Sequence, residues 1–106
     1  MNRTPIRVFA QFKGLSEQGA RELSDHYEHD LCDFSQGELE FEYEGPYFMA
    51  EDFVELARNH LLEQGQGWVD VIDNLDWTVT RYHVLPGGAT HKTLPIDSVL
   101  EQYHQE

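Results

Sequence analysis

The sequence lacks the residues that would cross-link it or carry it through a membrane. It has one cysteine, Cys32, which cannot form an intramolecular disulfide and is typical of a reducing compartment. It has no run of 18 apolar residues, and residues 1–7 are followed by no apolar stretch of signal-peptide length. We therefore expect a cytoplasmic protein that has no membrane partner.

Positive charge is also scarce. The chain has 7 lysines and arginines against 20 aspartates and glutamates, which gives a formal net charge of −13. Proteins that bind phosphate backbones or anionic bilayers do so mainly through lysine and arginine, so this balance argues against direct nucleic-acid binding. We expect a basic protein as the partner, and association with further copies of the chain stays open.

The apolar content is sufficient for a folded chain. Leucine, isoleucine, valine and phenylalanine make up about a quarter of the 106 residues, above the level at which a highly charged chain stays disordered. No repeat, low-complexity tract or linker interrupts the sequence. We expect a single domain over residues 1–106.

Alternating apolar and polar residues predict strands over residues 6–13 and 38–44, because side chains of a strand point alternately to its two faces. Apolar residues at spacings of three and four predict helices from Ser16 to about Cys32, from about Ala50 to Gln64, and from Pro95 to about Tyr103. Strands are also predicted over residues 69–72 and 75–85, and residues 90–94 fit either a hairpin partner or a mobile loop.

These elements follow the order β-α-β-α-β-(β)-α. The order predicts an α+β or α/β two-layer sandwich, in which helices cover mainly one face of a mixed sheet of three to five strands. The first two strands should be parallel, since a helix-length crossover joins them. Trp68 and Trp77 are expected to lie in the core.

Two alternative functions rest on single features of the first predicted helix. Glu22, His26, His29 and Asp33 share the helix face opposite its apolar stripe, which suits a divalent-metal-binding protein, although four ligands on one straight helix do not converge on one ion. Cys32, with six scattered histidines, would serve a small enzyme of unknown class, but a thiol near the end of an amphipathic helix usually only fills space. We therefore assign no catalytic residue, metal ligand or cofactor.

The most distinctive feature of the sequence is the segregation of its charge. Between Arg21 and Arg58 there are twelve acidic residues and no lysine or arginine. Within this window Glu38, Glu40, Glu42 and Glu44 alternate along the second predicted strand, at intervals of about 7 Å on one face. Solubility or salt adaptation would also produce an acidic surface.

The first predicted strand completes this surface if the two strands are neighbours. Its polar face would then bring Arg7 and Lys13 beside the glutamates and relieve part of their repulsion, while Phe9 adds an exposed aromatic contact. From this we predict a partner-binding face made of Glu38, Glu40, Glu42, Glu44 and Phe9. The expected function is that of a small acidic binding or regulatory module, which docks a basic protein or mimics nucleic acid.

Overall fold

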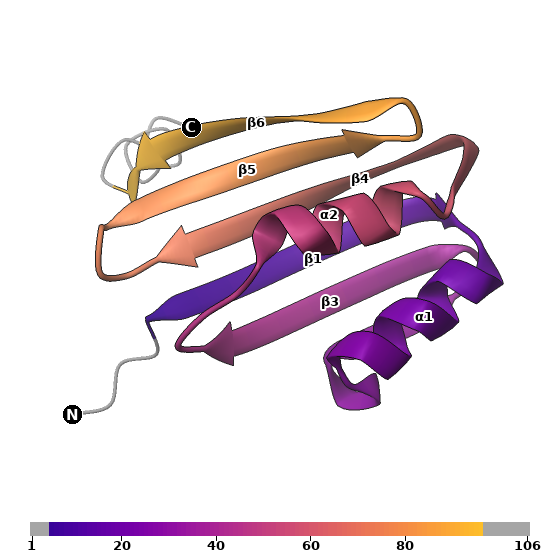
Figure 1. The fold of residues 1–106 in the computed structure, drawn as a ribbon, viewed down its shortest axis with the longest axis horizontal. Coiled ribbons are helices and arrows are strands. Elements are labelled where there is room, and N and C mark those ends of the chain that lie inside the picture. The colour runs from indigo at the N-terminus through magenta and orange to yellow at the C-terminus, as the bar shows by residue number, and fades with distance from the viewer. Residues whose placement is uncertain (1–4, 97–106) are drawn as a thin grey trace, which may run out of the picture.

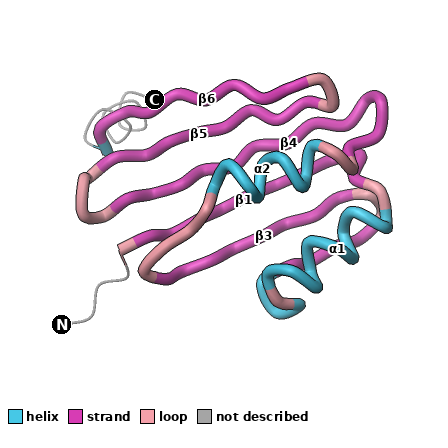
Figure 2. The backbone as a smooth tube through the Cα atoms, viewed as in Figure 1, coloured by secondary structure: helices cyan, strands magenta, loops and turns pink. Residues whose placement is uncertain are grey.

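The computed structural model describes residues 5–96, which fold as a six-stranded sheet with two helices (Figures 1 and 2). The elements are β1 (Ile6–Leu15), α1 (Glu17–Tyr27), a short 3₁₀ turn η1 (His29–Leu31), β2 (Cys32–Ser35), β3 (Glu38–Gly45), α2 (Ala50–Arg58), β4 (Leu61–Asp73), β5 (Thr78–Leu85) and β6 (Gly88–Pro95). None of the helices within residues 5–96 has the length and apolar character needed to cross a membrane.

The sheet is antiparallel throughout the described residues. Its strand order is β2-β3-β1-β4-β5-β6, and each neighbouring pair runs in opposite directions. The predicted parallel pairing of the first two long strands is therefore wrong. The physical reason is β2, because it reverses the chain before β3 through a tight turn at Gln36 and Gly37, which have φ of 53° and 81°. Two consecutive residues with positive φ are typical of a two-residue hairpin turn.

The predicted α+β or α/β sandwich with a mixed sheet of three to five strands is also wrong. The structure is a small β-rich fold dominated by six antiparallel strands, with helices of 11 and 9 residues. Some residues that the apolar spacing predicted as helix are strand instead. Residues 32–35 form β2, and β4 already begins at Leu61. The predicted helix from Pro95 to Tyr103 falls almost entirely outside the described residues.

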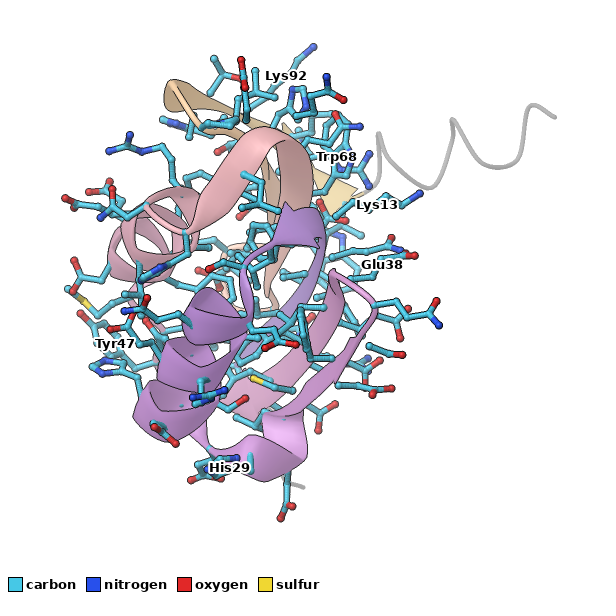
Figure 3. The ribbon with its side chains drawn as sticks, turned by 90° about the vertical axis from the view of Figure 1, so that its right-hand side faces the viewer. Lys13, His29, Glu38, Tyr47, Trp68 and Lys92 are labelled. Carbon is cyan, nitrogen blue, oxygen red and sulfur yellow. The ribbon has the colours of Figure 1, made fainter. Side chains whose placement is uncertain are left out.

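Both helices pack on one face of the sheet and enclose the core (Figure 3). Phe12 of β1, Phe41 of β3 and Phe53 of α2 are fully buried there, and the Phe53 ring centre lies 6.0 Å from that of Phe12 and 4.6 Å from that of Phe41. Burying one such ring contributes about 1.5–3 kcal/mol. These contacts fix α2 over the middle of the sheet and leave the opposite face without a covering layer among the described elements.

The ends of α1 follow from local backbone chemistry. Ser16 caps its start, where its hydroxyl oxygen accepts a hydrogen bond of 3.0 Å from the N–H of Gly19. The helix ends at Tyr27 because Glu28 has φ of 104°, which no helix residue can adopt. The apolar spacing that suggested a helix as far as Cys32 therefore continues through η1 and into a strand.

The last three strands form a meander. The Asp73 carboxylate accepts hydrogen bonds from the N–H groups of Leu75 and Asp76, which ends β4 in a side-chain-stabilised turn. A second turn at Pro86 and Gly87 joins β5 to β6. Residues 90–94 thus belong to a hairpin strand, which was one of the two structures that their sequence allowed.

Candidate functional site

The face of the sheet opposite the helices, which we call the open face, presents the alternate side chains of all six strands. Lys13, Glu38 and Trp68 project from it, away from the helices, whereas Tyr47 lies on the helix side (Figure 3). The strand registers place these side chains on the open face: Asp33 and Ser35 from β2; Glu38, Glu40, Glu42 and Glu44 from β3; Arg7, Phe9, Gln11 and Lys13 from β1; Gln66, Trp68, Asp70 and Ile72 from β4; Val79, Arg81 and His83 from β5; and Thr90, Lys92 and Leu94 from β6.

The ladder between β1 and β3 carries opposite charges only at its ends. Arg7 pairs with Glu44, with 2.9 Å between the guanidinium Nε and the carboxylate oxygen Oε1, and Lys13 stands in register with Glu38. In the two middle rows the glutamates face uncharged residues, since Glu40 is opposite Gln11 and Glu42 is opposite Phe9. The negative charge of β3 is therefore left unbalanced at its centre.

A third acid adds to this imbalance from β2. Asp33 stands directly opposite Glu40 in the β2–β3 ladder, and like charges in such a position destabilise a sheet. The described residues form no ion pair with Asp33, Glu40 or Glu42. The other central acid, Asp70, is neutralised, because Arg81 donates two hydrogen bonds to its carboxylate at 2.7 and 2.9 Å.

Asp33, Glu40 and Glu42 line a groove of about 610 Å³ in the open face, referred to below as the groove. Asp30 and Leu31 border it from η1, and the aromatic residues Phe9 and Trp68 line it from the sheet. Arg81 is its one basic residue among those described, and it is engaged with Asp70. The remaining lining residues are Ala10, Gln11, Cys32, Asp33, Glu40, Phe41 and Glu42.

The aromatic rings of the groove are held in place by cationic and imidazole groups. Trp68 stacks on His83 with ring centres 4.1 Å apart and an interplanar angle of 10°. The guanidinium carbon of Arg81 lies 5.6 Å from the Trp68 ring, and that of Arg7 lies 5.2 Å from the Phe9 ring. Aromatic faces attract cations, as carboxylates do. Both rings therefore add to the attraction of the groove for a cationic group.

The structure brings together the five residues that the sequence singled out, and it gives them different environments. All four glutamates and Phe9 lie on the open face, and Arg7 and Lys13 emerge there in an antiparallel register. Only Glu40, Glu42 and Phe9 line the groove, while Glu38 and Glu44 lie at the charge-matched ends. Phe9 is half-buried, where the sequence had indicated an exposed ring.

Among the residues that line the groove, sequence reasoning did not assign to it the other four charged residues or the tryptophan: Asp30, Asp33, Asp70, Arg81 and Trp68. Trp68 and Trp77 were expected in the core, but each leaves 43% of its surface exposed. For Trp68 the signal was present in the sequence, since it alternates in phase with Gln66 and Asp70 and so belongs to the polar face of β4. Asp33 could not be found without recognising β2 as a strand.

The four residues considered as metal ligands are spread over three elements, α1, η1 and β2. Glu22 pairs with His60, and the Nε2 atom of His29 lies 3.0 Å from the Oδ1 atom of Asp25. His26 packs against the Tyr27 ring, and Asp33 lies in β2. Within residues 5–96 no group of three or more histidine, cysteine, aspartate or glutamate side chains could hold a metal ion.

Cys32 borders the groove as a half-buried thiol. Burial raises the pKa of Cys32 above its ordinary value, and a side-chain hydrogen bond with Ser24 offsets part of this shift. The thiol therefore stays protonated at neutral pH. Because the thiolate is the reactive form, Cys32 is not an activated nucleophile.

Comparison of the chain with protein-family models, with curated proteins and with solved structures gave no match.

Proposed function

We propose that the protein binds a basic protein partner, and that an arginine- or lysine-rich segment of this partner lies across the open face with its cationic side chains in the groove. The observation that supports this best is the placement of Asp33, Glu40 and Glu42. Among the described residues these three acids form no ion pair, and they line a groove that also exposes aromatic surface.

The energetics favour such a partner. Carboxylates held about 5–7 Å apart on neighbouring positions of a sheet repel one another, and a bound cation replaces this repulsion by attraction. Complementary charge also speeds the encounter between two proteins and excludes acidic competitors. The aromatic rings of Phe9 and Trp68 add contact area that is independent of salt, which distinguishes the groove from an acidic surface that serves solubility alone.

Mimicry of nucleic acid is the second way in which the glutamates of β3 could bind a basic protein, with their carboxylates in place of phosphates. The carboxylates in this row recur about every 7 Å along β3, whereas a DNA duplex carries one charge per about 1.7 Å of its axis. Aromatic rings also interrupt the row on the β1 and β4 sides. The charge density of the groove is therefore too low to imitate a duplex closely, and it fits a short basic protein segment better.

A charge-reversal experiment with a matched control tests this proposal. The variant E40K/E42K changes two groove acids, and the control E51K/E55K makes the same change of net charge at two exposed positions of α2, on the helix side of the sheet. The probe is a fluorescent nona-arginine peptide, with binding measured by anisotropy at about 0.05 M and about 0.15 M salt.

We expect E40K/E42K to weaken peptide binding at least tenfold and E51K/E55K to weaken it less than about threefold at the same salt concentration. Circular dichroism and thermal melting establish that both variants keep the fold. If the two double variants lose the same affinity, the peptide senses only net charge, and the groove is not a binding site.

A further inference from the structure

The strand β6 forms one edge of the sheet, and none of the described elements pairs with its outer side (Figure 1). It is eight residues long, whereas β2 at the opposite edge has only four. An edge strand exposes a row of backbone N–H and C=O groups that can template another strand. The length of β6 makes it the better template of the two edges.

The hairpin geometry identifies the backbone groups that face outward. Leu85 and Gly88 close the two-residue turn, and hydrogen-bonded pairs alternate from there, so Thr90, Lys92 and Leu94 bond to β5. The N–H of Ile96 donates to the carbonyl oxygen of Trp77 at 2.9 Å, which continues the same phase. The outward-facing groups are therefore those of Ala89, His91 and Thr93.

The charge of this edge differs from that of the long acidic segment between Arg21 and Asp76. The sequence has no acidic residue between Asp76 and Asp97, a segment that contains all of β5 and β6 together with Arg81 and Lys92. Two copies of a chain with a net charge of −13 repel one another at most approaches. An approach through β6 brings together the two segments that carry no acid.

We propose that β6 pairs with β6 of a second copy, antiparallel and centred on His91, so that the two sheets join into one. This register pairs residues 88–94 completely, with Ala89 opposite Thr93 of the second copy and Thr90 opposite Lys92. It supplies about six hydrogen bonds between the chains. Pro95, which has no N–H, falls just beyond the paired segment.

The neighbouring registers are less favourable. Moving the centre to Lys92 sets the two Lys92 side chains directly opposite each other, and like charges in that position destabilise a sheet. Moving it to Thr90 brings the turn at Gly87 into the ladder and leaves Thr93 without a strand partner. The His91-centred register avoids both costs.

Amide hydrogen exchange measured by NMR tests this pairing directly. In a monomer the N–H groups of Thr90 and Lys92 are protected by β5, while those of Ala89, His91 and Thr93 exchange freely. We expect these three amides to become protected as the protein concentration rises from about 10 µM to about 1 mM, the range of a weak interface. Free exchange at all concentrations overturns the proposal, and so does protection that is independent of concentration.

Two substitutions at one position then test the register. Thr90→Glu places an acid opposite Lys92 of the second copy, whereas Thr90→Lys places a base there. Because the two-fold symmetry doubles each contact, we expect T90E to tighten the dimer about two- to thirtyfold and T90K to weaken it by a similar factor in sedimentation equilibrium. Equal effects of the two variants, or the reverse order, overturn the His91-centred register.

Discussion

At the scale of single residues, the contact between Phe12 and Gly67 shows how closely the core is fitted. The two residues are cross-strand neighbours in β1 and β4, and the Phe12 ring occupies the space that a side chain at position 67 would need. Phe12 is itself fully buried between this backbone and α2. A glycine is thus required here by packing.

The first prediction concerns this contact. Gly67→Ala should lower the free energy of unfolding by about 1–3 kcal/mol, because the added methyl group overlaps the Phe12 ring and a packed core relaxes only partly. Gly87→Ala is the control, since nothing lies within 4 Å of a methyl group at that turn position. Urea denaturation of both variants measures the difference, and equal losses would contradict the packing assigned to Phe12.

Residue type alone misleads at Trp68. Tryptophan is usually a core residue, yet Trp68 lies in the polar phase of β4 and stacks on His83 at the open face. The groove residues Glu40 and Glu42 could be predicted because their alternation is local to one strand. Asp70 and Arg81 could not be joined to them, since the sequence does not show which strands are neighbours.

At the scale of elements, the sequence located β1 and β3 but not β2, the start of β4 or the ends of the helices. Residues 6–13 and 38–44 do form strand, because alternation over seven or more residues fits no helix. The four residues of β2 carry too short a pattern to be separated from the helix before them. Because the prediction lacked β2, it also lacked the chain reversal between β2 and β3. For this reason it made β1 and β3 parallel, whereas they are antiparallel.

The pairing of β2 with β3 gives the second prediction. Asp33→Asn should raise the free energy of unfolding by about 0.2–1 kcal/mol at low salt, because it removes the like charge that faces Glu40. Glu63→Gln, at an exposed position of β4, removes one acid elsewhere and should leave stability nearly unchanged. A gain that persists unchanged in about 1 M salt would show that repulsion is not its cause.

At the scale of the whole molecule, the two faces of the sheet have different roles: one forms the core, and the other carries the proposed binding surface. The helix side holds the buried aromatic cluster, and the open face holds the unbalanced charge. Substitutions on the open face can therefore change binding without opening a cavity. The cost of this arrangement is electrostatic repulsion within a chain of net charge −13.

The third prediction follows from that repulsion. Raising the salt concentration from about 0.01 M to about 0.1 M shortens the screening length from about 30 Å to about 10 Å. We expect the melting temperature to rise by several degrees, about 4–8 °C for each kcal/mol of relieved repulsion. The E51K/E55K variant, which is less negative, should gain less over the same range. A melting temperature that falls or stays constant would contradict this account.

The position of β1 between β3 and β4 also has a consequence for the biosynthesis of the protein. β1 leaves the ribosome before either neighbour, and its register with β4 cannot be completed until Asp73 has been made. At about 5–20 residues per second this interval is on the order of seconds. During it β1 lacks at least one of its two neighbours, so the nascent chain exposes apolar side chains such as Val8 and Phe12 that the finished fold buries.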